Sequence, residues 1–102
     1  MKSLVISRNM DVLAGLRLSG IEGIYCKNKE VLKENFKKYK NSENIGIIIL
    51  TEDDFKEIER DVIEVKLSRK LPLVVAVPDR SGLKDRDLIM RYIKESVGIK
   101  VD

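Results

Sequence analysis

Two runs of apolar residues, 46–50 and 73–77, constrain the fold of this chain more than any other feature. Each run ends at polar residues, and a charged segment whose apolar residues have helical spacing follows it. Strands that are apolar throughout are buried on both faces, and strands that alternate with amphipathic helices form parallel sheets. The chain is therefore predicted to be an α/β protein with helices on both faces of a parallel sheet.

The same patterns place four strands and four helices along the chain. Strands are expected at residues 3–7, 23–26, 45–50 and 72–78. The expected helices are one at 10–18, one at 28–39, one with a buried stripe at Phe55, Ile58, Val62 and Val65, and one at 85–97. Asn9 is predicted to cap the first helix, and Ser19 and Gly20 to end it.

Right-handed crossover connections limit the order of these strands. We predict a three-layer, flavodoxin- or Rossmann-like fold with strand order 2-1-3-4. The second and third helices cover one face, and the first and last cover the other. The short second strand lies at an edge, where Lys27 suits a strand that must not pair with other chains. We expect one domain of residues 1–102, with a globular core at 1–78, a loop or hinge at 79–84 and a C-terminal helix and tail at 85–102.

Composition narrows the classes of function. The 102 residues carry 20 basic and 17 acidic side chains, which largely interleave, and only three tyrosines and two phenylalanines are aromatic. A nucleic-acid partner is therefore not expected, because such partners are held by basic patches and aromatic stacking. Histidine, the commonest general base, is absent from the sequence. No apolar run approaches 18 residues, so we expect a cytoplasmic protein without direct membrane insertion.

The carboxyl ends of the strands, where open parallel sheets bind ligands, offer few groups for chemistry. The crevice between the first and third strands is expected to be lined by Ser7, Arg8, Asn9, Thr51, Glu52 and Asp53. A phospho-acceptor receiver domain would need acids after the first strand and also a fifth strand, whereas a dinucleotide site would need a glycine-rich turn after the first strand. The sequence has none of these features. We therefore expect no catalytic, cofactor or metal site.

Two further features are open to a functional and a structural interpretation. Cys26 is the single cysteine, which excludes an internal disulfide, and we interpret it as a small buried hydrophobe rather than a redox group. The acids at 52–54 could hold a divalent cation, but the dipole of a helix also favours acids in its first turn, and we prefer that explanation. Thr51 and Asp54 also resemble a capping box.

The second and third helices carry opposite charge. Residues 27–40 contain six lysines, and residues 52–64 contain seven acidic side chains. Because both helices are expected on one face of the sheet, we interpret this pattern as mutual screening, in which each exposed pair contributes little.

Four segments, taken together, resemble the F subunit of the V/A-type rotary ATPases. They are Asp-Val-Leu-Ala-Gly-Leu-Arg-Leu-Ser-Gly-Ile at 11–21, the strand and turn at 45–52, the Leu-Pro segment at 71–82 and the closing Val-Gly-Ile region at 93–101. Leu16 stands where the family usually has Phe, Ser19 where it has Ala, and residues 7–9 where Gly-Asp is common.

The resemblance implies a non-catalytic subunit of the central stalk, bound to the coiled-coil shaft subunit and peripheral to the membrane. It also implies a mobile C-terminal helix that can approach the head subunits and regulate ATP hydrolysis. The sequence leaves open whether that helix moves or stays docked, which ion is moved, and in which direction the complex works.

Partner contacts are expected on two surfaces. Candidates for the shaft are Arg17, Ile21, Ile24 and Tyr25, and candidates for the head are Arg91 and Lys94. The alternative function is a stand-alone small-molecule-sensing or receiver-like domain that uses the crevice at the strand ends.

Overall fold

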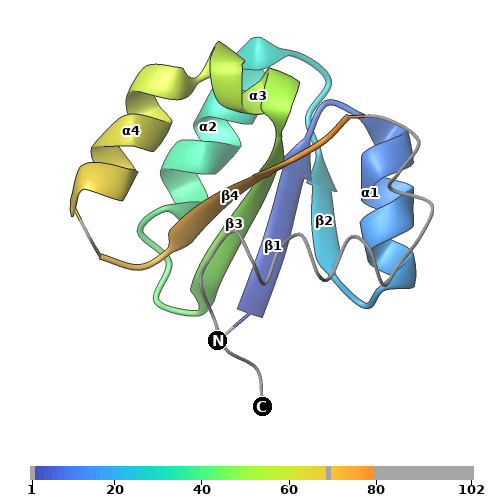
Figure 1. Ribbon diagram of the computed structural model, residues 1–102, viewed down its shortest axis with the longest axis horizontal. Coiled ribbons are helices and arrows are strands. Elements are labelled where there is room, and N and C mark those ends of the chain that lie inside the picture. The colour runs from blue at the N-terminus through green and yellow to red at the C-terminus, as the bar shows by residue number, and fades with distance from the viewer. Residues whose placement is uncertain (1, 69, 80–102) are drawn as a thin grey trace.

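The computed structural model describes residues 2–68 and 70–79 (Figure 1). Its elements are β1 (Lys2–Ser7), α1 (Met10–Leu18), β2 (Glu22–Tyr25), α2 (Lys29–Tyr39), β3 (Ile45–Thr51), α3 (Glu52–Glu57), α4 (Glu59–Ser68) and β4 (Leu73–Val77). The expected hinge at 79–84, except Asp79, and the expected helix at 85–97, which includes Arg91 and Lys94, lie outside the described residues.

The four strands form one parallel sheet in the order β2-β1-β3-β4, which confirms the predicted fold class and strand order. In Figure 1, α1 lies on one side of the sheet, beside β2, and α2, α3 and α4 lie on the other. The second strand begins one residue earlier than predicted, at Glu22, and ends at Tyr25. The next N–H, that of Cys26, still donates to the carbonyl of Ser7 on β1 at 2.8 Å.

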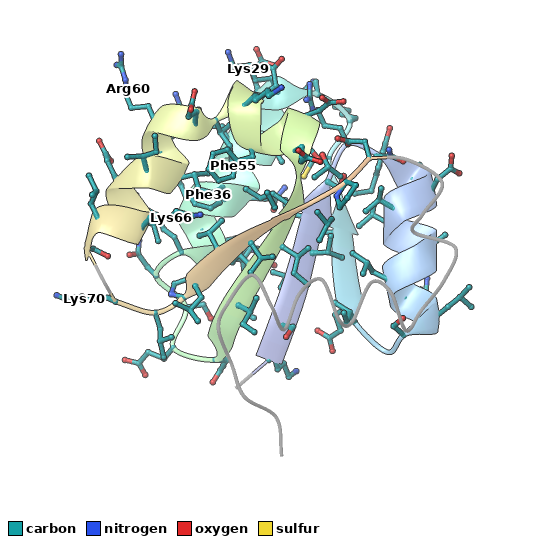
Figure 2. The ribbon with its side chains drawn as sticks, in the orientation of Figure 1. Lys29, Phe36, Phe55, Arg60, Lys66 and Lys70 are labelled. Atoms are coloured by element: carbon teal, nitrogen blue, oxygen red, sulfur yellow. The ribbon has the colours of Figure 1, made fainter. Side chains whose placement is uncertain are left out.

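Each face of the sheet has its own hydrophobic core. The larger core contains Phe36 of α2 and Val62 of α4, and Phe55 packs against it (Figure 2). The smaller core lies under α1. Its buried members are Val5, Val12, Leu16, Ile21, Ile49, Val75 and Val77. The alternation of β1 explains the division, because Leu4 and Ile6 belong to the larger core and Val5 to the smaller one.

One prediction about the helices is wrong. The third helix was expected to be continuous, but it is divided at Ile58, whose backbone has φ −120° and ψ 30°. The expected stripe is nevertheless correct, since Ile58 and Val62 are buried and Phe55 and Val65 pack beside them. The division keeps the short α3 at the end of β3, where Asp54 is held, while α4 packs beside β4.

Both ends of α1 are fixed by local hydrogen bonds. At its start, the Asn9 side chain accepts from the N–H groups of Asp11 and Val12, which confirms the predicted cap. At its end, the N–H of Gly20 donates to Arg17 and that of Ile21 to Leu16. This pair of bonds is a Schellman motif, in which Gly20 takes a left-handed conformation with φ 83°.

Replacement of Gly20 tests this end of the helix. Gly20→Ala should lower the free energy of unfolding by about 1–2 kcal/mol, because a Cβ at positive φ approaches the following carbonyl oxygen. The space around it is open, so the cost comes from the backbone alone. Gly20→Asn should cost less, since Asn tolerates this region better. Chemical denaturation measures both, and equal stability of all three proteins would contradict the assignment.

Candidate functional site

A buried carboxylate lies where β1 and β3 end. The side chain of Asp54, on α3, is only 2% exposed. Its Oδ2 accepts from the hydroxyl of Ser7 at 2.7 Å and from the N–H of Arg8 at 3.2 Å. Its Oδ1 accepts from Nε of Arg8 at 2.6 Å. One acid therefore receives three donors from residues 46 and 47 positions earlier in the chain.

These bonds join the starts of two helices. The hydroxyl of Ser7 also accepts from the N–H of Asn9, the residue that caps α1. On the other side, the hydroxyl of Thr51 accepts from the N–H of Asp54 and so caps α3. A continuous network runs from the cap of α1 through Ser7 and Asp54 to the cap of α3.

Arg8 is the cation of this network. Its side chain is 30% exposed, and it also lies 4.0 Å from Glu57. The hydrogen bond to Asp54 raises the pKa of Arg8 above its ordinary value, and partial burial opposes that effect. Arg8 therefore remains a cation beside the buried carboxylate.

The sequence interpretation of the acids at 52–54 needs a correction. Thr51 caps the helix as predicted, but the Asp54 carboxylate contacts Ser7 and Arg8 rather than completing a capping box at Thr51. The helix dipole alone therefore does not explain the acid at position 54. Its neighbours Glu52 and Asp53 are exposed, as that account expects.

The predicted crevice at the strand ends is present as a cavity of about 330 Å³. Its lining residues are Arg8, Asn9, Met10, Thr51, Asp53, Asp54 and Asp79. Ser7 and Glu52, which were expected there, are not in the lining. Across residues 2–68 and 70–79, no group of three or more possible metal ligands is brought together.

Cys26 is fully buried in the larger core, and its sulfur accepts from the side-chain amide of Asn35 at 3.6 Å. Burial raises the pKa of the Cys26 thiol, while the hydrogen bond from Asn35 opposes the rise. A buried thiol with a raised pKa is a poor nucleophile. These contacts support the interpretation of Cys26 as a small hydrophobe.

The opposite charges of the second and third predicted helices meet as expected. Lys29 lies 3.7 Å from Glu57, and Lys33 lies 3.9 Å from Asp61. Lys29, Lys33 and Glu57 are exposed, and the Asp61 side chain is 16% exposed. Because both pairs reach solvent, they screen charge and add little stability.

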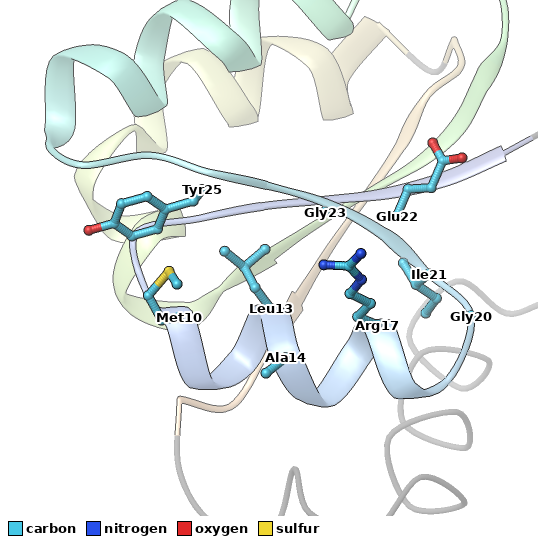
Figure 3. A pocket seen from close by; sticks show the side chains of 9 residues that line it. All are labelled: Met10, Leu13, Ala14, Arg17, Gly20, Ile21, Glu22, Gly23 and Tyr25. Atoms are coloured by element: carbon cyan, nitrogen blue, oxygen red, sulfur yellow. The ribbon is translucent and has the colours of Figure 1, made fainter.

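A larger groove lies between α1 and β2, at the edge of the sheet, with a volume of about 690 Å³ (Figure 3). Its lining residues are Met10, Leu13, Ala14, Arg17, Gly20, Ile21, Glu22, Gly23 and Tyr25. Met10 is 61% exposed and Tyr25 is 50% exposed, so two large apolar side chains meet water at one end. Arg17 stands at the other end (Figure 3).

The four predicted shaft contacts do not all lie on one surface. Arg17, Ile21 and Tyr25 line the groove, although Ile21 is mostly buried in the smaller core. Ile24 does not line it, because alternation along β2 turns this side chain to the opposite face, where it packs against the larger core.

Sequence reasoning missed Met10, Leu13 and Gly23 as groove residues. Met10 could have been found, since an apolar residue directly after a helix cap and outside the buried stripe points to solvent. Gly23 lies in a tightly packed place: a Cβ on it would lie 2.7 Å from Cδ2 of Leu13 and 2.9 Å from Cγ1 of Val5, so both side chains would have to shift. The absence of a side chain at this position leaves room for Leu13 of α1 beside β2.

Comparison with known families adds an independent finding. Residues 4–97 match the family described as ATP synthase (F/14-kDa) subunit. The chain belongs to this family.

Individual relatives agree with the family match. The F subunit of the A-type ATP synthase of Methanosphaera stadtmanae is 33% identical over 101 residues, covering 96% of this chain and 94% of that protein. The corresponding protein of Methanococcus aeolicus is 29% identical over 104 residues and covers 99% of both chains. That of Thermococcus kodakarensis is 29% identical over 104 residues and covers 96% of both.

Membership in this family confirms the resemblance to the F subunit of the V/A-type ATPases. The chain is accordingly a non-catalytic subunit of an ATP synthase complex, with a partner inside that complex. This finding decides against the stand-alone sensing domain. Among the described helices, none has the length and apolar character needed to cross a membrane.

The buried network yields a stability prediction. Asp54→Ala should lower the free energy of unfolding by about 2–4 kcal/mol, because the Ser7 hydroxyl and the Arg8 guanidinium lose their acceptor. The partial exposure of Arg8 lets water replace some of this loss. Asp53→Ala, at an exposed neighbour, is the matched control and should change stability by less than about 0.5 kcal/mol. Urea denaturation compares the two, and similar small losses for both variants would show that the network is dispensable.

Proposed function

We propose that this protein belongs to the central stalk and binds the coiled-coil shaft subunit through the groove between α1 and β2. The observation that supports the proposal is the groove itself, which combines two exposed apolar side chains, Met10 and Tyr25, with the cation Arg17. Protein interfaces are enriched in aromatic residues, Met and Arg, and such residues often carry most of the binding energy.

The chemistry of the groove suits a permanent protein contact. A rotor subunit must hold its partner against torque, so its binding surface needs apolar area that water leaves on association. Met10 and Tyr25 provide this area at one end, and they lie beside each other in Figure 3. Arg17 has no carboxylate within 4.0 Å in the described part of the chain and can therefore pair with an acid of the partner.

Binding of the recombinant shaft subunit tests the proposal. Arg17→Glu should weaken binding by about tenfold or more, because it replaces a cation facing the partner by an anion. Tyr25→Ala should weaken it by about tenfold to a hundredfold, which corresponds to the loss of one interface anchor. Isothermal titration calorimetry measures both affinities.

Two controls match these variants on the other side of the sheet. Arg60→Glu reverses another exposed helical arginine, which Figure 2 shows extending away from α4, and Leu67→Ala truncates an exposed apolar side chain of the same helix. Both should bind the shaft like the unaltered chain. If the α4 variants weaken binding and the groove variants do not, the shaft site lies elsewhere.

We also propose that residues 85–97 regulate ATP hydrolysis by contacting the head subunits, through Arg91 and Lys94. Apolar residues recur at helical spacing in this segment, and the two basic residues fall outside that stripe. A double substitution of Arg91→Glu and Lys94→Glu should change the ATP hydrolysis rate of the assembled complex severalfold while leaving shaft binding intact. An unchanged rate at equal subunit occupancy would refute the regulatory role.

A further inference from the structure

The groove borders an open strand edge. β2 pairs only with β1 among the described strands and ends the sheet. The register pairs Ile6 with Ile24 and Ser7 with Tyr25, and the N–H of Cys26 donates to the carbonyl of Ser7. In a parallel ladder, alternate residues point their N–H and C=O groups at the neighbour. Gly23 and Tyr25 therefore direct theirs away from the sheet, and both are exposed.

Helix α1 lies beside this edge and forms one wall of the groove next to it. Figure 3 shows the side chains of Met10, Leu13 and Arg17 rising from α1 toward β2. A strand added next to β2 would occupy the open edge, and its side chains on the α1 face would enter the groove. The groove therefore lies where the side chains of an additional strand would be.

From this arrangement we infer that the shaft subunit binds through an extended segment outside its coiled coil, which pairs with the β2 edge as an additional strand of the sheet. The inference rests on the proposed function, because it specifies how the shaft subunit is held at the same groove. It also predicts the composition of that segment.

The spacing of the groove residues fits a strand. Met10 and Arg17 are seven residues apart on α1, so their Cα atoms are separated by about 10 Å along the helix axis. Side chains on one face of a strand repeat every ~6.6 Å, so three of them cover ~13 Å. The segment should therefore carry an apolar residue at the Met10 and Tyr25 end, a small or apolar residue over Gly23, and an acid near Arg17, at alternate positions.

The charges near the edge limit which strands can pair with it. The edge strand has only four residues, of which Glu22 is the first, and Lys27 follows it closely; charged side chains discourage pairing with unrelated strands. Within this strand, two residues, Gly23 and Tyr25, offer outward backbone groups. A segment that cannot also fill the groove would gain little from so short a ladder. The charged side chains and the short ladder that protect the edge thus also restrict it to segments that can fill the groove.

Tyr25→Pro separates strand addition from side-chain packing. Proline removes the outward N–H of Tyr25 and leaves the β1 ladder intact, and edge strands tolerate it when that N–H faces solvent. Compared with Tyr25→Ala, which loses the ring alone, Tyr25→Pro should bind the recombinant shaft subunit about 5- to 10-fold more weakly. Thermal denaturation checks that the two variants fold equally well.

Hydrogen exchange of the unaltered chain provides a second measurement that needs no variant. The amides of Gly23 and Tyr25 should exchange freely in the isolated chain and become protected in the complex with the shaft subunit. If the complex forms, Tyr25→Ala weakens it, and both amides still exchange as in the free chain, the groove holds a helix and strand addition is wrong. If no groove variant changes binding, the proposed shaft site is itself wrong, and strand addition at this edge is excluded with it.

Discussion

The structure depends on one buried carboxylate. Removing the charge of Asp54 from water is costly, and three hydrogen bonds from Ser7 and Arg8 offset that cost. Because the donors lie at the end of β1 and the acceptor lies in the helix that follows β3, these bonds fix how the two central strands end relative to each other. In a fold of this class the carboxyl ends of the strands commonly hold a ligand. In this chain an internal ion pair occupies the corresponding position.

The groove between α1 and β2 follows from this arrangement in two steps. Ser7, held by Asp54, accepts from the N–H of Asn9, and Asn9 caps α1, so the start of the helix is fixed to the sheet. Its end is fixed by the Schellman turn at Gly20. One wall of the groove is therefore α1, which polar contacts hold at both ends. The other wall is β2, a strand of the sheet.

The sequence predicts most of the fold, because a buried parallel strand has a distinctive apolar pattern, as at 46–50. It does not predict the role of Asp54, since an acid in a first helical turn looks the same whether it faces water or a distant arginine. It also does not predict that Ile24 faces away from the groove and packs against the larger core. Over a strand of four residues, alternation is too short to show which side chains face the groove. The division at Ile58 is hidden for a related reason, because the buried stripe keeps its spacing on both sides of the break.

The groove belongs almost wholly to one contiguous part of the chain, from Met10 to Tyr25. This segment is joined to the rest of the protein chiefly through the hydrogen bonds between β1 and β2 and through the packing of α1 on the smaller core. If the shaft subunit binds at the groove, as proposed, and pulls on it along the strands, the hydrogen bonds of this ladder share the load as a group. A pull across the strands would instead break them one after another. Under that proposal, the direction of the strands relative to the axis of rotation sets how much torque the attachment can carry.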